Sequence, residues 1–263
     1  MTAITQVNKL STSWPKWGLR ALSLGIFASV WEILANQIDS LLLPTFSATL
    51  VDLIGLLGTT ELWQSFWISN QAMILGFLLS LAIGIPLGIT MGRWQKAEKI
   101  TNLYLNILLV TPMSALIPIF IIAIGLGLGS RVLVVFVFAV VVITVNTRAG
   151  LKSIDSTLIE MAHSFGATEQ QLWQQILLPG ALPAMATGVR LGLARAISGM
   201  IVVELLLVAT GVGRLILSYQ ADFKSSLVYA VVFVVLIEAV ILTWLINYIT
   251  QKLLPWKSEV TIE

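Results

Sequence analysis

The sequence predicts an all-α membrane protein, a polytopic bundle of about six transmembrane helices. Of the 263 residues, 57% are hydrophobic and only 11% are charged, whereas an ordinary globular domain carries roughly 25% charged residues. The mean hydropathy is +0.94, and the apolar residues form long runs separated by short polar stretches. This composition is typical of a chain that lies mostly in a lipid bilayer.

About six apolar runs are long enough to span a membrane, for which about 20 residues are needed. They are Leu19–Gln37, Ile68–Met91, Leu103–Ile124, Val132–Ala149, Ala184–Thr210 and Leu227–Ile249. The third run contains Pro112 and Pro118, so we expect that span to be bent. The chain is thereby divided into an N-terminal segment (1–18), a transmembrane domain (19–250) and a C-terminal tail (251–263).

Lysine and arginine are distributed unevenly between the two sides of the predicted bundle. Twelve of the fifteen fall on one side, and the other side holds only Arg131, Arg214 and Lys224. The twelve are Lys9, Lys16, Arg20, Arg93, Lys96, Lys99, Arg148, Lys152, Arg190, Arg195, Lys252 and Lys257. Because cytoplasmic loops carry the excess of basic residues, we expect both termini to lie in the cytoplasm.

The longest polar, helix-patterned stretch lies within residues 153–183, between the fourth and fifth spans on the predicted cytoplasmic side. Gly166 interrupts its helical pattern, which favours a left-handed turn at the end of a first helix. Thr168 and Gln171 fit a capping box that begins a second helix. We therefore expect a hairpin of two short helices.

Two prolines, Pro179 and Pro183, follow the second helix of this hairpin. Proline lacks the amide hydrogen that a helix interior needs, so we expect these residues to end the helix before the fifth span begins. Periodicity alone leaves two interpretations open. The hairpin is either a surface connection between two spans or a docking element for another protein.

Small residues recur at every fourth position of the second span and again in the fifth. They are Gly76, Ser80, Gly84, Gly88 and Gly92 in the second span, and Gly188, Gly192 and Ala196 in the fifth. Lipid tails provide no hydrophobic force between helices, so such stripes are where helices approach closely. We expect Gly84, Gly88, Gly188 and Gly192 to serve helix packing within one subunit, with a dimer contact or a gate as the alternative.

Glu32, Glu204 and Glu238 are ionisable residues inside the predicted spans. A charge inside hydrocarbon costs from about 3 to more than 10 kcal/mol, so each is a candidate functional residue. Glu204 precedes the expected break of the fifth span and is the strongest candidate for a gate. A proton-coupled secondary carrier using Glu204 and Glu238 is the alternative function. Arg190 and Arg195, near the inner end of the fifth span, are expected to snorkel toward the cytoplasm.

Several functions are disfavoured by what the sequence lacks. It has no cysteine and therefore no disulfide or thiolate metal site. It also lacks a G-x-x-x-x-G-K-[ST] phosphate loop, an H-E-x-x-H zinc motif and a basic stripe with aromatics for nucleic acid. We expect no catalytic residue, no metal, no cofactor and no nucleic-acid partner.

The stretch from Glu160 to Pro179 reads EMAHSFGATEQQLWQQILLP. Its spacing resembles the E-A-A-x3-G-x9-I-x-L-P signature (EAA motif) of the membrane subunits of bacterial ABC importers. The matching positions are Glu160, Ala162, Gly166, Ile176, Leu178 and Pro179. Further runs, at 41–44, 74–92, 146–150 and 201–213, are similar to the permease branch that imports nitrate, bicarbonate, sulfonates and taurine.

The resemblance implies a type I ABC importer permease, a multi-pass subunit of the bacterial inner membrane without an ATPase site of its own. Two separate ATPase subunits would dock on the hairpin through the six matching residues. A second copy of the permease would complete the translocation path as a homodimer. An extracytoplasmic solute-binding protein would deliver a small anionic solute, and the lipid bilayer would surround the bundle.

The chain departs from the family pattern in two places. Met161 replaces the first alanine of the signature, which puts a larger, flexible side chain at a packed contact. The segment Tyr104–Ile124 lacks the tryptophan-phenylalanine-glycine run of the branch. Because this segment is expected to line the path, the substrate cannot be carried over, and nitrate-like anions, sulfonates and vitamin precursors stay open.

Overall fold

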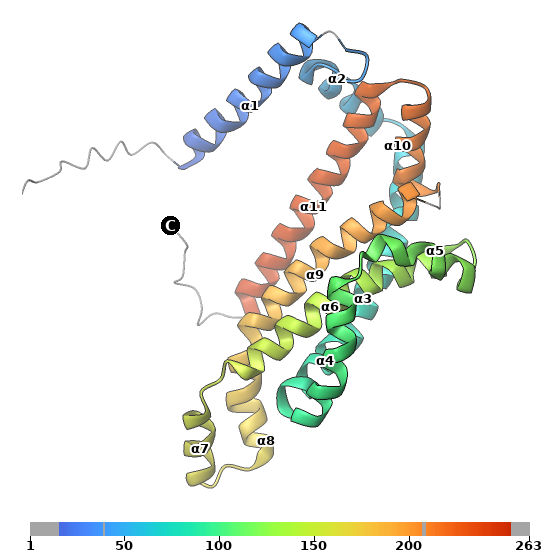
Figure 1. Cartoon of the computed structure of the whole chain (residues 1–263). Helices are drawn as coiled ribbons and strands as arrows, with labels where there is room; N and C mark the ends of the chain where they lie inside the picture. Colours follow the sequence, from blue (N-terminus) through green and yellow to red (C-terminus); the bar gives the residue numbers. More distant parts are fainter. Residues whose placement is uncertain (1–15, 39, 207–208, 254–263) are drawn as a thin grey trace, which may run out of the picture.

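The computed structural model describes residues 16–38, 40–206 and 209–253, and every regular element within these ranges is a helix (Figure 1). In chain order the helices are α1 (Lys16–Ile38), α2 (Phe46–Leu57), α3 (Thr60–Arg93), α4 (Gln95–Val110), α5 (Met113–Ile124), α6 (Leu128–Lys152), α7 (Ser156–Ser164), α8 (Glu169–Leu172), the π-helical turn η1 (Trp173–Leu177), α9 (Leu178–Leu206), α10 (Gly211–Ala221) and α11 (Ser225–Leu253). The prediction of an all-α membrane protein is confirmed. The predicted segments 1–18 and 251–263 lie largely outside the described residues.

Four helices, α1, α3, α6 and α11, are long and apolar enough to cross a membrane. Two bent pairs pass the same test together: α4 with α5, and the helix over Glu169–Leu206 with α10. Counting each bent pair as one span gives six spans, which confirms the predicted number.

The third predicted span, Leu103–Ile124, is wrong as a single helix. Its two halves, α4 and α5, meet at 105° around Thr111 and Pro112, which have extended backbones with ψ of 128° and 106°. A residue before proline is pushed out of the helical region by the proline ring, so the helix ends at Val110 and restarts in a new direction. The sequence predicted the bend but not its size.

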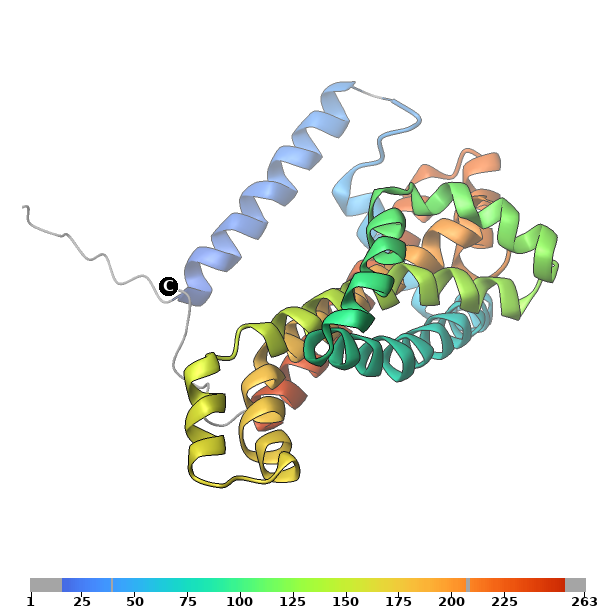
Figure 2. The ribbon, with the colours of Figure 1, turned by 60° about the horizontal axis from the view of Figure 1, so that its bottom comes forward.

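The centre of the bundle is the contact between α3 and α6, which run parallel and side by side (Figure 2). A Cβ atom added at Gly88 would lie 2.5 Å from the Cβ of Thr147, and one at Gly76 would lie 2.6 Å from the Cβ of Val135. At Gly84 the nearest atom would be 3.1 Å away. The small-residue stripe therefore lies where the two helix backbones approach most closely.

Helix α9 packs along the other side of α6 in the antiparallel direction. A Cβ atom at Gly188 would lie 2.7 Å from the Cβ of Asn146, and one at Gly192 would lie 2.6 Å from the Cγ1 of Ile143. Two close helix contacts on opposite sides of α6 thus join α3, α6 and α9 into one unit. We call the end of this unit that carries α7 and α8 the hairpin end.

At the opposite end, α2, the start of α3, α10 and the first half of α11 form a separate apolar cluster. Its fully buried members include Leu62, Leu215 and Val231. Helix α1 joins this region through Trp31, whose ring stacks on Phe233 with centroids 5.8 Å apart. Elsewhere α1 stands apart from the bundle (Figure 1).

The prediction that Pro179 and Pro183 end the second hairpin helix is wrong. The helix continues from Glu169 to Leu206, with Pro179 in the first turn of α9 and Pro183 inside it. The preceding residues form a π turn in which the N–H of Leu178 donates to the carbonyl oxygen of Trp173. In a π turn each carbonyl accepts a hydrogen bond from the N–H five residues ahead. The helix therefore continues although Pro179 has no N–H to donate.

Candidate functional site

The first helix of the hairpin, α7, ends as the sequence predicts. Gly166 has φ of +75°, the left-handed region in which a residue without Cβ is unstrained. The N–H of Ala167 donates to the carbonyl oxygen of Ala162 at 3.0 Å, and that of Gly166 donates to His163 at 2.9 Å. This pair of bonds closes a helix end with a left-handed residue and fixes the direction in which the chain leaves α7.

Both helices of the hairpin begin with a side-chain cap. Thr168 and Gln171 form the predicted capping box at the start of α8. Asp155 caps α7, and its carboxylate accepts a hydrogen bond from the N–H of Thr157 at 2.9 Å. The hydrogen bonds that Thr157 donates from its backbone and its side chain hold the pKa of the Asp155 carboxyl below its usual range. The two caps and the turn at Gly166 therefore fix where each helix of the hairpin begins and where the first one ends.

The outer face of α7 is apolar and uncovered. No residue of α7 is buried, and the exposed fractions of Leu158, Met161 and Phe165 are 49%, 49% and 86%. These residues are three and four positions apart, so they lie on one face of the helix. Leu172 of α8, by contrast, is buried.

The second helix of the hairpin is anchored to the bundle. Leu172 and Leu177 are buried, and Trp173 packs against the apolar cluster of α6 and α9 that contains Leu151 and Met185. The Nη2 atom of Arg93, at the end of α3, lies 3.3 Å from an Oε atom of Glu169. The hairpin is thus attached to α3, α6 and α9.

The six residues of the signature are divided between the two halves of the hairpin. Glu160 and Gly166 are exposed on and after α7, and Ala162 is half-buried. Ile176, Leu178 and Pro179 are half-buried at the junction of η1 and α9. The first group lies on the exposed part of the hairpin, and the second group lies where the hairpin meets the bundle.

A buried polar network lies at the opposite end of the bundle, around Glu204 of α9. Glu204 is fully buried, and its carboxylate accepts hydrogen bonds from the hydroxyl of Ser69 at 2.8 Å and the N–H of Gly213 at 3.0 Å. The Nη1 atom of Arg131 lies 3.4 Å from the other carboxylate oxygen and 3.1 Å from the carbonyl oxygen of Ile68. This network ties α3, α6, α9 and α10 together.

The two other intramembrane carboxylates have different surroundings. The carboxylate of Glu32 accepts hydrogen bonds from the hydroxyl and the N–H of Ser47, at 2.7 and 3.0 Å, so it joins α1 to the first turn of α2. Glu238 is buried beside Asn70 of α3. Within the described ranges, one oxygen of Glu238 has no hydrogen-bond partner.

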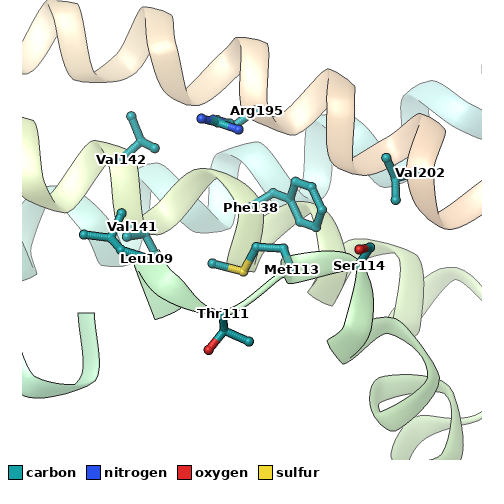
Figure 3. A pocket seen from close by; sticks show the side chains of 9 residues that line it. All are labelled: Leu109, Thr111, Met113, Ser114, Phe138, Val141, Val142, Arg195 and Val202. Carbon is teal, nitrogen blue, oxygen red and sulfur yellow. The ribbon is translucent and has the colours of Figure 1, made fainter. Parts of the chain in front are cut away.

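A pocket of about 360 Å³ lies between the α4–α5 turn, α6 and α9 (Figure 3). Figure 3 shows Arg195 of α9 on one side of it and Thr111, Met113 and Ser114 on the other. The structure places Arg195 in the interior of α9, away from both helix ends, whereas the sequence placed it near the inner end of the span. Because α9 begins at Leu178, earlier than predicted, Arg195 lies deeper along the helix than the sequence indicated.

The ion pair between Arg131 and Glu204 was not predicted from the sequence, although the positions of the two residues in their helices could have indicated it. Arg131 lies in the first turn of α6 and Glu204 in the last turn of α9, and these helices are antiparallel. Residues at the start of one span and the end of the next lie at the same level of the bundle. The sequence also assigned Arg131 to a loop, whereas its side chain is only 8% exposed.

The fold and the hairpin define the class of the protein: a polytopic helical membrane protein with a folded two-helix hairpin at one end. The chain belongs to the family of binding-protein-dependent transport system inner membrane components, whose profile matches residues 84–255. It is therefore a permease component of an ABC importer, a class of subunit that works with separate ATPase and binding proteins. Membership of this family gives no support to the alternative of a proton-coupled carrier.

The curated relatives agree with this assignment over almost their whole length. The chain is 29% identical to the taurine transport system permease protein TauC of Escherichia coli, with 96% of each chain covered. It is 30% identical to the formylaminopyrimidine transport permease protein ThiX of Halalkalibacterium halodurans, covering 88% of this chain and 92% of ThiX. Similarity to the taurine permease confirms the branch that the sequence indicated.

The solved structures show the same fold. A chain of the inward-facing methionine ABC transporter MetNI superposes with a TM-score of 0.59 at 23% identity, covering 74% of this chain and 95% of that chain. The architecture of a type I ABC importer permease is thereby confirmed for this chain.

Proposed function

We propose that two copies of this chain form the translocation path of an ATP-driven importer for a small anionic solute. In this proposal two ATPase subunits dock on the hairpin from the cytoplasm, and an extracytoplasmic binding protein delivers the solute at the other side. Both termini, segments 1–18 and 251–263, lie in the cytoplasm, and residues 19–250 form the transmembrane domain of a bacterial inner-membrane protein.

The observation that carries the proposal is the hairpin itself. It exposes an apolar face on α7, while its second helix continues into α9 and forms an ion pair with the end of α3. Exposed apolar faces of this kind are typical of protein contact sites. A partner that binds α7 and moves would move α9 with it, which is the rigid-body change that alternating access requires. Glu160, Ala162, Gly166, Ile176, Leu178 and Pro179 are proposed as the coupling residues.

The proposed roles of the glycines and of Glu204 follow from their positions. Gly84, Gly88, Gly188 and Gly192 would keep α3, α6 and α9 together as one moving unit, since each faces a neighbouring helix. Glu204 would hold the opposite end of that unit closed through its network with Arg131. The presence of an anionic group on the solute is supported by the similarity to a taurine permease, since taurine carries a sulfonate.

Co-purification and coupled ATP hydrolysis test the proposal. The tagged chain should bring down an ATPase subunit from its own host. In the reconstituted complex, Gly166→Pro and Glu160→Lys should abolish the stimulation of ATP hydrolysis by solute-loaded binding protein, because the first distorts the hairpin turn and the second reverses a charge on its surface.

Two control variants separate coupling from folding. Gly166→Asn keeps a residue that tolerates the left-handed region and should keep most of the coupling. Lys99→Glu reverses an exposed charge on α4, outside the hairpin, and should leave coupling intact. Fully coupled hydrolysis in both Gly166→Pro and Glu160→Lys would show that the hairpin is not the docking element.

A further inference from the structure

The pocket between the α4–α5 turn, α6 and α9 has one charged lining residue, Arg195. The remaining lining is apolar apart from Thr111 and Ser114; the apolar residues are Leu109, Met113, Phe138, Val141, Val142 and Val202. A volume of about 360 Å³ is at the lower end of the range of small-molecule pockets. The pocket thus combines one cation, two hydroxyls and an apolar wall.

Arg195 lies near the middle of the bundle. Its neighbours on α9, Gly192 and Gly199, face Ile143 and Phe138 of α6, so Arg195 lies opposite the segment between them. That segment is about 15 Å from either end of α6, at 1.5 Å per residue. A hydrocarbon core is about 30 Å thick, so the guanidinium is too deep to reach either surface along its own side chain.

Arg195 is also exposed and unpaired. Within the described part of the chain no hydrogen-bond acceptor or carboxylate contacts its guanidinium, whereas Arg131 is paired with Glu204 and Arg148 with Glu98. Arg190, five residues earlier on the same helix, donates to the side-chain oxygen of Asn247 on α11 at 3.2 Å. An unpaired arginine at this depth is unfavourable against lipid and is found facing water or a functional partner.

Given the proposed function, we infer that Arg195 binds the anionic group of the transported solute as the solute passes this pocket. The apolar wall would contact the body of a small organic anion, such as a sulfonate or carboxylate, and the Ser114 hydroxyl would lie at its edge. Water in the path would solvate Arg195 when no solute is bound.

The absence of cysteine from the chain allows a direct test with S114C as a reporter. Membrane vesicles that contain the full chain are treated with an anionic and a cationic methanethiosulfonate reagent, and the ratio of the two labelling rates is measured. The ratio is compared between variants, which cancels the intrinsic reactivity of each reagent. We expect R195Q to lower the anion-to-cation ratio about tenfold, since a focused charge changes association rates by this amount or more.

Two matched variants complete the experiment. R195K keeps the charge and should keep the ratio, and R190Q removes the neighbouring arginine and should also leave the ratio unchanged. Methanesulfonate should protect S114C from an uncharged methanethiosulfonate, while tetramethylammonium should not. That protection should be lost in R195Q and kept in R190Q.

Three results would overturn the inference. The first is an unchanged rate ratio in R195Q, and the second is an S114C thiol that neither reagent reaches, which would place the pocket against lipid or protein. The third is dissociation of the assembly in R195Q but not in R190Q, which would show that Arg195 pairs with a second copy. Labelling requires neither ATP nor a partner, so its failure is distinct from failure of the hairpin to couple hydrolysis.

Discussion

The Nη1 atom of Arg131 lies 3.4 Å from the Oε1 atom of Glu204, and the two side chains are 8% and 0% exposed. Arg131 comes from the first turn of α6 and Glu204 from the last turn of α9, so this ion pair joins the two helices at the end of the proposed moving unit that is farthest from the hairpin. Ser69 of α3 and Gly213 of α10 complete the network.

Removing one member of this pair should destabilise the protein strongly. Arg131→Met leaves the Glu204 carboxylate buried without its cation, and breaking a buried pair in this way costs about 3–5 kcal/mol. Urea or SDS unfolding in lipid nanodiscs would measure the loss. The double variant R131M/E204L, which removes both charges, should recover most of it, and equal losses in the single and double variants would contradict the role of the ion pair.

The glycine stripe predicts a rank order of alanine substitutions. Gly88→Ala places a Cβ atom 2.5 Å from Thr147 and should cost about 1–3 kcal/mol, as overpacking does. Gly84→Ala, with its nearest atom at 3.1 Å, should cost less. Gly25→Ala on α1, with nothing within 4 Å, is the matched control and should be neutral or stabilising. Thermal unfolding of the three variants would check the order.

The cap at Asp155 predicts a local dependence on pH. Because its hydrogen bonds lower the pKa of the Asp155 carboxyl, the folded hairpin binds the proton less tightly than the unfolded chain does. The contribution of the cap is therefore complete above the usual value of about 4 and is lost as pH falls through the lowered pKa. The protection factor of the Thr157 amide, which is its exchange rate relative to an unfolded amide at the same pH, should fall at acid pH, and Asp155→Asn should remove this dependence.

Glu238→Gln should leave ATP-driven solute uptake near the level of the unchanged protein. The amide keeps the size of the side chain and can still form a hydrogen bond with Asn70, and no step of the proposed function requires a proton at this position. Uptake into proteoliposomes that contain the complete transporter would measure the effect. A complete loss of uptake, with folding unchanged, would show that Glu238 takes part in transport.

The helices and their number could be predicted because a helix that crosses a bilayer needs about 20 mostly apolar residues, and such runs can be recognised in the sequence. The angle between α4 and α5 could not, since Pro112 specifies that a helix ends but not where the next one points. The capping box and the turn at Gly166 were predictable because both depend on residues close together in the chain.

The candidate site was harder to predict, and one wrong inference explains much of the difficulty. A proline normally ends a helix, so the fifth span was expected to begin after Pro183, which placed Arg195 near the membrane surface. The π turn before Pro179 keeps the helix continuous, and the same arginine therefore lies at the centre of the bundle. The partners of Arg131 and Glu204 were missed because contacts between spans depend on their relative heights.

The continuous helix from Glu169 to Leu206 has a mechanical consequence. At 1.5 Å per residue it is about 55 Å long, and it connects the hairpin, Arg195 and Glu204 in that order. A small tilt imposed at one end must displace the other end in the opposite direction about a fulcrum near the glycines that contact α6. Force applied to the hairpin would then reach the proposed solute site and the ion pair through one continuous helix.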